Sequence, residues 1–330
     1  MVVAKKYILK KQFSGFPKAT DVQIVEEEIR PLNDGEFLAE AVYLSVDPYM
    51  RLFEQPIGQV LMGSQVAKII ESKLEGYPVG KYVVGHFGWR THTISKELNI
   101  PNQILPNFAN MPLSLALGAL GLTGNTAYFG ILEICKPQKG ETVVISLAGG
   151  AVGSHAGQIA KILGCKVIGI LGDDEKGKYI TEELGFDHFI NYKKSNLKEE
   201  LKKLAPNGID CYFDNVGGQM SNTVVSLMNR LGRSAVGGFI SLYNTATSDA
   251  QRVPVLPLED CIVLKQLRIE GFVIQTWYSR WNEAIEQNLK WIQEGKLKYR
   301  ETIVEGFENV MDAFLDMLKG KTIGKTIVKI

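Results

Sequence analysis

The chain has 330 residues, which at ~150 residues per domain suggests about two domains. Hydrophobic residues make up 45% of it and charged residues 22%, so we expect a packed core and exclude intrinsic disorder. The net charge of +1 excludes nucleic acid or an anionic membrane as the main partner. The longest apolar stretch, 111–122, is too short to span a bilayer, and the first residues lack a signal-peptide pattern. We therefore expect a soluble, cytoplasmic protein without membrane insertion.

The first 121 residues are predicted to be β-rich, because short runs of strand-forming residues alternate with Pro, Gly and Asn. The runs are 37–46, 65–71 and 81–86. Few segments in this part are periodic enough to predict helices.

After residue 118 the pattern becomes an alternation of buried strands and amphipathic helices. The predicted strands are 141–147, 166–171, 188–191, 210–214, 232–239 and 269–274. The predicted helices are 123–134, the segment from the glycine loop to 163, 175–184, 197–204, 220–228 and 278–294. Such an alternation indicates right-handed βαβ units and a parallel, doubly wound sheet. A final helix, 307–318, and a final strand, 325–330, suggest that the tail rejoins the N-terminal region, which would make the sheet domain an insertion.

A glycine-containing loop follows the first strand of this half and opens a helix. It contains Gly150, Ala151, Val152, Gly153 and Ser154, and Ala148 occupies the first position of a G-x-G-x-x-G pattern. Gly150 would let the backbone approach a pyrophosphate, and Gly153 would permit close packing of helix on strand. The helix N-terminus supplies N–H groups for the anion. The strand–turn–helix context favours a dinucleotide site over a purely structural turn.

The end of the second strand bears on the choice of cofactor. NAD enzymes place an acid ~20 residues after the loop, where NADP enzymes have a cation. If the last strand residue fills that position, it is Leu171, with Lys176 one turn later and Tyr192 after the third strand. Asp173 either caps the following helix or holds an NAD ribose. We favour NADPH.

The cysteine and histidine positions argue against a metal site. The chain has four Cys and no Cys-x-x-Cys pair, so buried, inert thiols are expected. Residues 1–121 contain no Cys and only two His, His86 and His92. We therefore expect no catalytic zinc and no other bound metal.

Several segments together resemble the zinc-independent medium-chain dehydrogenase/reductase superfamily, and within it the prostaglandin reductase and leukotriene B4 12-hydroxydehydrogenase branch. They are 45–51 (SVDPYMR), 121–128 (GLTGNTAY), 149–154 (GGAVGS), 210–218 (DCYFDNVGG), 305–309 (EGFEN) and 324–329 (GKTIVK). The resemblance covers nearly the whole chain.

This resemblance implies a GroES-like β-rich catalytic domain, residues 1–121 and 296–330, around a Rossmann NADP-binding domain, residues 122–295. It implies NADPH-dependent reduction of the carbon–carbon double bond of α,β-unsaturated ketones and aldehydes, such as 15-oxo-prostaglandins and 2-alkenals. Oxidation of the leukotriene B4 12-hydroxyl, a place in fatty acid and lipid metabolism, and a homodimer are further expectations. The alternatives are an NADPH quinone oxidoreductase and a non-catalytic NADPH-binding protein.

The resemblance also carries over a set of cofactor contacts. Besides residues 150–154, these are Lys176, Tyr192, Asn215, Gly237, Gly238, Phe239, Ile240, Ser241, Leu242, Tyr243, Phe272, Val273, Ile274 and Thr322. The chain departs from the family pattern twice, with Thr322 where Asn is usual and Asp173 where Ser is usual.

The resemblance implies that Tyr243 is the catalytic residue. Hydride delivery to an enone leaves negative charge on the carbonyl oxygen, and a neutral phenol can donate a hydrogen bond to it. The alternative is an aromatic side chain that only packs against the cofactor. Tyr49 and Arg51 are candidate substrate contacts, and for them a turn-stabilising ring and a salt bridge are the alternatives.

Overall fold

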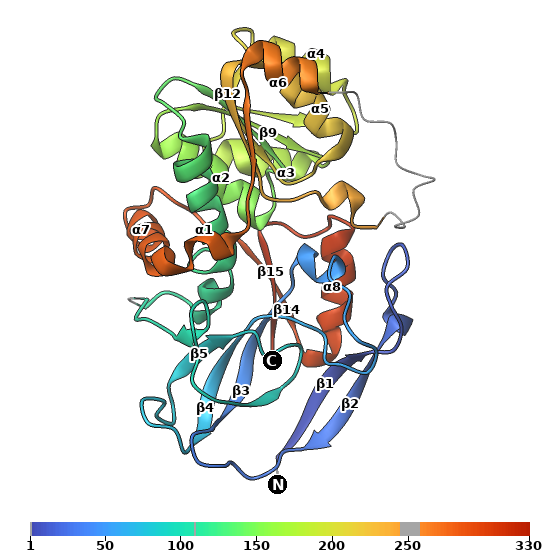
Figure 1. The fold of residues 1–330 in the computed structure, drawn as a ribbon, viewed down its shortest axis with the longest axis vertical. Helices are drawn as coiled ribbons and strands as arrows, with labels where there is room; N and C mark the ends of the chain where they lie inside the picture. Colours follow the sequence, from blue (N-terminus) through green and yellow to red (C-terminus); the bar gives the residue numbers. More distant parts are fainter. Residues whose placement is uncertain (1, 109, 245–257) are drawn as a thin grey trace. The chain divides into compact units, whose positions relative to one another are not determined.

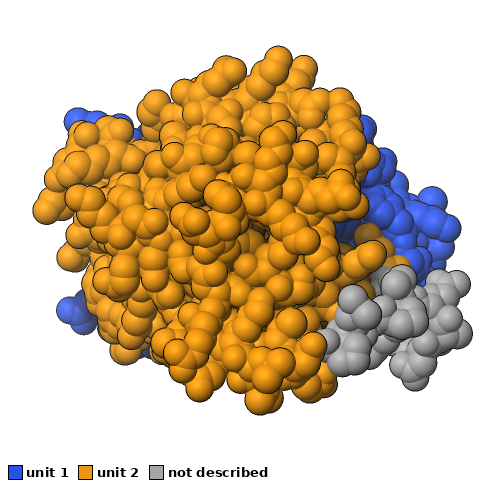
Figure 2. Space-filling view, turned by 90° about the horizontal axis from the view of Figure 1, so that it is seen from above, with its two compact units in different colours: residues 1–121, 301–330 blue, residues 122–300 orange. Residues whose placement is uncertain are grey.

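The computed structural model describes residues 2–108, 110–244 and 258–330. They form two compact units, which Figure 2 colours separately. Unit 1 comprises residues 1–121 and 301–330, and unit 2 comprises residues 122–300. Residues 296–300, which we grouped with the chain ends, cluster instead with unit 2. Among the described residues, no helix is long and apolar enough to cross a membrane.

Unit 1 is built on two sheets, one antiparallel and one mixed. Strands β1 (Val3–Leu9) and β2 (Val22–Glu28) form a two-stranded sheet. A larger sheet has the order β14 (Glu301–Glu305), β15 (Lys325–Lys329), β3 (Phe37–Ser45), β4 (Gln65–Ser72), β5 (Tyr82–Gly85) and β7 (Gln103–Ile104), with β6 (His92–Ser95) also paired to β3. The predicted return of the tail is confirmed, because β15 pairs antiparallel with β3. Strands β1, β2, β6, β7 and β14 were not predicted. The exposed faces of β1, β2 and β14 carry charged residues, and β6 and β7 are only four and two residues long.

Apolar burial explains why the tail returns to this unit. Ile327 and Val328 of β15 are fully buried. Helix α8 (Val310–Leu318) places Phe314 in the same core, where its ring lies 5.6 Å from that of Trp89. Each fully buried apolar side chain contributes about 1.5–3 kcal/mol, so burial of these side chains favours the return of the tail to unit 1.

A buried ion pair also ties the tail to unit 1. The Lys325 ammonium lies 2.8 Å from Asp47 Oδ1 and donates to the carbonyl oxygen of Val46 at 2.8 Å. Ser45 donates its hydroxyl to the other Asp47 oxygen. Because each charge is matched and hydrogen-bonded, burial of the pair is tolerated. The pair fixes the backbone directly before the 48–51 segment.

Unit 2 contains one parallel sheet, labelled in part in Figure 1. Its order is β10 (His188–Asn191), β9 (Lys166–Leu171), β8 (Thr142–Ser146), β11 (Ile209–Asp214), β12 (Met228–Val236) and β13 (Arg268–Gly271). The doubly wound prediction is therefore confirmed. Chain order reverses between β8 and β11, and ligands of such sheets bind outside the carboxyl ends at this switch point.

The helices of unit 2 are α1 (Leu122–Phe129), α2 (Ala151–Ile162), α3 (Asp174–Lys178), α4 (Leu197–Leu204), α5 (Gly218–Ser226), α6 (Glu259–Lys265) and α7 (Trp281–Gln293). Two predicted helices, 123–134 and 175–184, each end in a wider π-helical turn, Gly130–Cys135 and Tyr179–Glu183. The strand predicted over 269–274 ends at Gly271, because Ile274–Arg280 forms a 3-10 helix. Helix α6 was missed.

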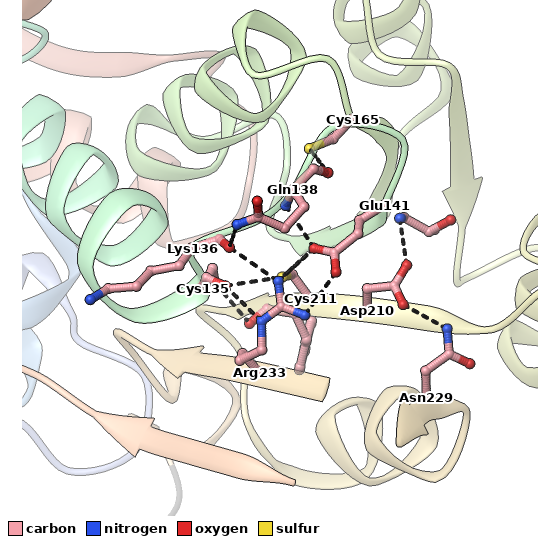
Figure 3. A network of polar contacts seen from close by, with 11 residues as sticks. Cys135, Lys136, Gln138, Glu141, Cys165, Asp210, Cys211, Asn229 and Arg233 are labelled. Atoms are coloured by element: carbon pink, nitrogen blue, oxygen red, sulfur yellow. Dashed lines mark hydrogen bonds and ion pairs between the residues drawn. The ribbon is translucent and has the colours of Figure 1, made fainter. Parts of the chain in front are cut away.

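A network of polar contacts closes the amino edge of this sheet (Figure 3). Arg233 pairs with Glu141 and donates from Nε to the Cys135 carbonyl oxygen at 2.9 Å. The predicted thiol burial is confirmed for Cys135, Cys165 and Cys211, whereas Cys261 is partly exposed. Burial raises the pKa of Cys165 to about 11, so this thiol is protonated and unreactive at neutral pH.

Candidate cofactor-binding site

The glycine loop joins β8 to α2 through a strained turn. Leu147, directly after the strand, has a φ of 54°, a region that side-chain-bearing residues rarely adopt. A Cβ on Gly153 would lie 2.4 Å from the Leu147 carbonyl oxygen, so only glycine permits this approach. Gly150 is the N-cap residue of α2. The packing role predicted for Gly153 thus has a direct geometric basis.

The first turn of α2 offers an anion-binding position. α2 has twelve residues and begins at Ala151, so its first N–H groups have no partner within the helix. The N-cap residue, Gly150, has no side chain that could accept hydrogen bonds from these N–H groups. A Cβ on Gly149 would lie 3.2 Å from the Cβ of Lys176, which places this lysine beside the loop. These features fit a dinucleotide pyrophosphate.

The two acids that follow β9 both have structural partners. Asp173 is the N-cap of α3, and its Oδ1 accepts from the Lys176 backbone N–H at 3.0 Å. Asp174 accepts from Asn191 Nδ2 at 2.6 Å and pairs with Lys194. The capping interpretation of Asp173 is therefore confirmed, and the apolar Leu171 is the last residue of the strand.

The side chains of Tyr192 and Lys193 lie against Gly172, just beyond β9. A Cβ on Gly172 would lie 2.8 Å from Cε of Lys193 and 3.0 Å from Cε1 of Tyr192. Burial lowers the pKa of Lys176. The positive charge of Lys193 lowers this pKa further, whereas the negative charge of Asp173 raises it. Lys193 was missed in the sequence, although it directly follows Tyr192. Two cations and a phenol form a suitable environment for a phosphate.

Asn215 lies at the switch point and joins the two central strands. Its Nδ2 donates to the Ser146 carbonyl oxygen, and its backbone N–H donates to Ser146 Oγ, both at 2.8 Å. Buried Asp214 shapes the turn that follows, because its Oδ1 accepts from the Val216 and Gly217 N–H groups at 2.9 and 3.0 Å. This explains why the DNVGG stretch forms a rigid turn beside the glycine loop.

The loop after β12 packs against that turn. A Cβ on Gly217, which has a φ of 71°, would lie 3.1 Å from the Cβ of Phe239. Ser241 donates its hydroxyl to the Val216 carbonyl oxygen at 2.6 Å. The loops after β8, β11 and β12 therefore meet at one edge of the sheet, which brings residues 150–154, Asn215 and 237–241 to the same region.

Tyr243 is half-buried at the end of this loop. Its ring packs edge-on against Phe239 at 5.1 Å, and its backbone N–H donates to the Ile240 carbonyl oxygen at 3.2 Å. Burial raises the pKa of the Tyr243 phenol, while an interaction with the Phe239 backbone opposes the shift. The hydroxyl is therefore protonated at neutral pH and able to donate.

The segment after β13 extends the same edge. Phe272 lies between Phe213 and Trp277, at ring distances of 6.1 and 5.7 Å. Val273 is exposed and Ile274 is buried. The Phe272 ring also lies close to the backbone of Gly237, where a Cβ would approach it to 3.2 Å.

Three predicted site residues belong to unit 1. Tyr49 packs edge-on against Phe53 at 6.3 Å. Arg51 donates to the Gly15 carbonyl oxygen from Nε at 3.1 Å and Nη2 at 2.9 Å. Thr322 accepts a hydrogen bond from the Thr326 hydroxyl at 2.9 Å.

The histidines of unit 1 engage nearby hydroxyls. His86 Nδ1 lies 2.8 Å from Ser64 Oγ, and His92 Nδ1 lies 3.0 Å from Thr91 Oγ1. Within the described ranges, no group of three or more His, Cys, Asp or Glu residues could hold a metal ion.

Comparisons with known proteins identify the family to which the chain belongs. Residues 5–102 match the family model of an N-terminal domain of oxidoreductase, and residues 151–293 match the zinc-binding dehydrogenase model. The chain is 47% identical to prostaglandin reductase 1 from Rattus norvegicus, over 100% of both proteins. The chain belongs to the medium-chain dehydrogenase/reductase family.

Two further relatives extend the comparison. The 2-alkenal reductase (NADP(+)-dependent) from Nicotiana tabacum is 36% identical, with 99% of this chain and 97% of that protein covered. The crystal structure of CurA in complex with NADPH from Vibrio vulnificus aligns with a TM-score of 0.90 and 36% identity, covering 98% of each chain. The family and fold predictions are thus confirmed.

Proposed function

We propose that this protein is an NADPH-dependent reductase that reduces the carbon–carbon double bond of α,β-unsaturated ketones and aldehydes. The observation that carries the proposal is identity along the full chain to prostaglandin reductase 1 and to an NADP-dependent 2-alkenal reductase. The end of β9 agrees with it, because Leu171 stands where an NAD enzyme has an acid, and Lys176 follows one turn later.

The residues at the carboxyl edge of the unit 2 sheet fit this cofactor. When bound, NADPH supplies the hydride for the reduction. The α2 N-terminus, with residues 150–154, would hold the pyrophosphate, and Lys176 and Tyr192 would hold the 2′-phosphate. Asn215, 237–243 and 272–274 line the same edge and are proposed as further contacts. Thr322 of unit 1 is proposed as the last contact.

Tyr243 is the proposed catalytic residue. As the double bond is reduced, negative charge gathers on the carbonyl oxygen of the substrate, and a donor placed there lowers the barrier. The raised pKa of the Tyr243 phenol supports this role, because the proton stays on the hydroxyl across the neutral range. A ring that only packs against the cofactor remains the alternative.

Tyr49 and Arg51 are proposed to contact substrate. Both are half-buried and follow Asp47, whose carboxylate is fixed by Lys325. The contacts of Arg51 with Gly15 hold its guanidinium in one place, which suits the orientation of a carboxylate. The proposed substrates are 15-oxo-prostaglandins and 2-alkenals, and oxidation of the leukotriene B4 12-hydroxyl is a further proposed activity. They place the enzyme in lipid metabolism.

We also propose a homodimer in the cytoplasm. Edge strand β13 pairs within the described residues only with β12. Close to it in sequence, Val263 and Leu264 are 70% and 78% exposed. Exposed apolar side chains beside an unpaired edge favour self-association. The ordinary composition and small net charge support a cytoplasmic location.

A steady-state assay tests the activity. NADPH absorbance is followed with 2-nonenal, a 15-oxo-prostaglandin and a quinone as acceptors. We expect oxidation with the first two and a reduced double bond in the product. Oxidation with the quinone alone would indicate a quinone reductase. Binding of NADPH without oxidation would indicate a non-catalytic protein.

A further inference from the structure

The loop that follows β10 brings a second lysine to the proposed 2′-phosphate position. Lys193 and Tyr192 are consecutive, and both side chains lie against the backbone of Gly172 at the end of β9. Lys176, on α3, lies beside the glycine loop, with its Cβ 3.2 Å from the position of a Cβ on Gly149, and the charge of Lys193 contributes to the lowering of its pKa. The two cations therefore come from helix α3 and from the loop after β10.

The negative charges near these lysines have other partners. Asp173 caps α3, and Asp174 accepts from Asn191 and pairs with Lys194. Within the part of the chain that the structure describes, the Lys193 ammonium has no hydrogen bond or ion pair. Repulsion from the charge of Lys193 contributes to the lowered pKa of Lys176, and a dianion bound near both lysines would relieve this repulsion.

We propose that Lys193 is a second cation for the ribose 2′-phosphate and a determinant of the preference for NADPH over NADH. This inference rests on the proposed use of NADPH. A phosphate monoester carries a charge of about −1.5 to −2 at neutral pH, which one lysine only partly neutralises. Lys176 and Lys193 together match that charge, and the Tyr192 hydroxyl supplies a neutral donor.

Gly172 keeps the space that this arrangement needs. A Cβ there would lie 2.8 Å from Cε of Lys193 and 3.0 Å from Cε1 of Tyr192, so both side chains would have to move. The backbone at Gly172 is not left-handed, since no positive φ occurs there. We therefore expect Gly172→Ala to fold and to displace Lys193 and Tyr192 together, which makes it a second variant that retains all charges and disturbs the proposed 2′-phosphate position.

Binding of adenine nucleotides tests the role of Lys193 without any catalytic step. Titration calorimetry compares 2′,5′-ADP, which carries the 2′-phosphate, with 5′-AMP, which lacks it. In Lys193→Ala we expect the affinity for 2′,5′-ADP to fall about 5- to 10-fold, as for loss of one charge-assisted contact, while that for 5′-AMP changes less than about 2-fold. Gly172→Ala should act in the same direction, and Lys193→Arg should restore most of the affinity.

Lys198→Ala is the matched control, because it removes the same charge from an exposed residue five positions further on, in α4, and leaves the pair of Lys194 with Asp174 intact. Equal losses in Lys193→Ala and Lys198→Ala, or equal losses for both nucleotides, would overturn the inference. A wild-type protein that prefers 2′,5′-ADP but is insensitive to Lys193→Ala would leave the proposed function intact and overturn only the role of Lys193. A wild-type protein that binds both nucleotides equally would overturn the NADPH preference as well.

Discussion

Arg233 and Glu141 form a two-pronged ion pair across the amino edge of the unit 2 sheet (Figure 3). Arg233 Nη1 lies 3.1 Å from Oε1 and Nη2 lies 2.5 Å from Oε2 of Glu141. The same guanidinium donates to the carbonyl oxygens of Cys135 and Lys136, at the end of the helical turn before β8. The Arg233 side chain thus donates to carbonyl groups at a helix C-terminus. It also holds the residue before β8, the strand that leads to the glycine loop.

Arg233→Ala is expected to lower the free energy of unfolding by about 2 kcal/mol. The pair is about four-fifths buried, so its loss should cost more than a surface pair and less than a fully buried one. Urea denaturation measures the change. Arg230→Ala, on the same strand but exposed and bonded to Gln266, is the control and should change stability by less than about 0.5 kcal/mol. Equal effects of the two substitutions would contradict the role of Arg233.

The stability of the protein is expected to depend on the ionisation of Glu141. Burial alone would raise the pKa of Glu141, but hydrogen bonds from Arg233 and from the Gln138 N–H outweigh it and leave the pKa lowered. A depressed pKa contributes stability above the unfolded-state value, and the contribution is lost as pH falls through the folded-state value. The stability gap between wild type and Glu141→Gln should therefore shrink as pH falls below about 4. Denaturation curves at several pH values check this, and a gap that widens on acidification would exclude it.

Lys176→Ala is expected to raise KM for NADPH about 10-fold and to leave KM for NADH nearly unchanged. The lysine lies beside the glycine loop and close to Lys193, where only the 2′-phosphate distinguishes the two cofactors. Steady-state kinetics with both cofactors measure the effect. Lys178→Ala, an exposed lysine on the same helix, is the control. Equal losses with both cofactors would show that Lys176 does not read the 2′-phosphate.

Enone reduction is expected to continue after exhaustive chelation. Residues 1–121 contain no Cys, and His86 and His92 contact hydroxyl groups of Ser64 and Thr91. Activity after dialysis against a chelator, with metal analysis of the same sample, tests this. Stoichiometric zinc whose removal abolishes activity would refute it and would agree with the name of the family model that matches 151–293.

Tyr243→Phe is expected to lower kcat roughly 10-fold or more, with little change in KM for NADPH. A 10-fold drop corresponds to a loss of about 1.4 kcal/mol of transition-state stabilisation. The substitution removes only the hydroxyl and keeps the ring that packs on Phe239. A cofactor ribose hydroxyl would replace part of the lost hydrogen bond, so the drop should be smaller than the ~10²–10³ of a typical oxyanion donor. If the variant has the turnover of the wild type, the Tyr243 hydroxyl has no catalytic role and the ring only packs against its neighbours.

The sequence alone determined most of unit 2. The buried strand β9 is a nearly continuous apolar run, so it could be bounded correctly, as could the short edge strand β10 and helix α4 with its polar and apolar faces. The glycine loop was recognisable because close backbone approach demands glycine at a fixed spacing, and at Gly153 no Cβ fits. These features depend on neighbours within a few residues, which a sequence displays directly.

The tertiary structure decided which distant residues meet. Arg233 and Glu141 are 92 positions apart, and Lys325 and Asp47 are 278 apart, so no local pattern identifies either pair among the many charges of the chain. Asp173 could be a cap or a ribose ligand until its bond to the Lys176 N–H was seen. Lys193 joined the candidate site only because the parallel pairing of β9 and β10 places their carboxyl ends side by side. Charge partners are set by topology, since electrostatic attraction acts through space and carries no information about spacing along the chain.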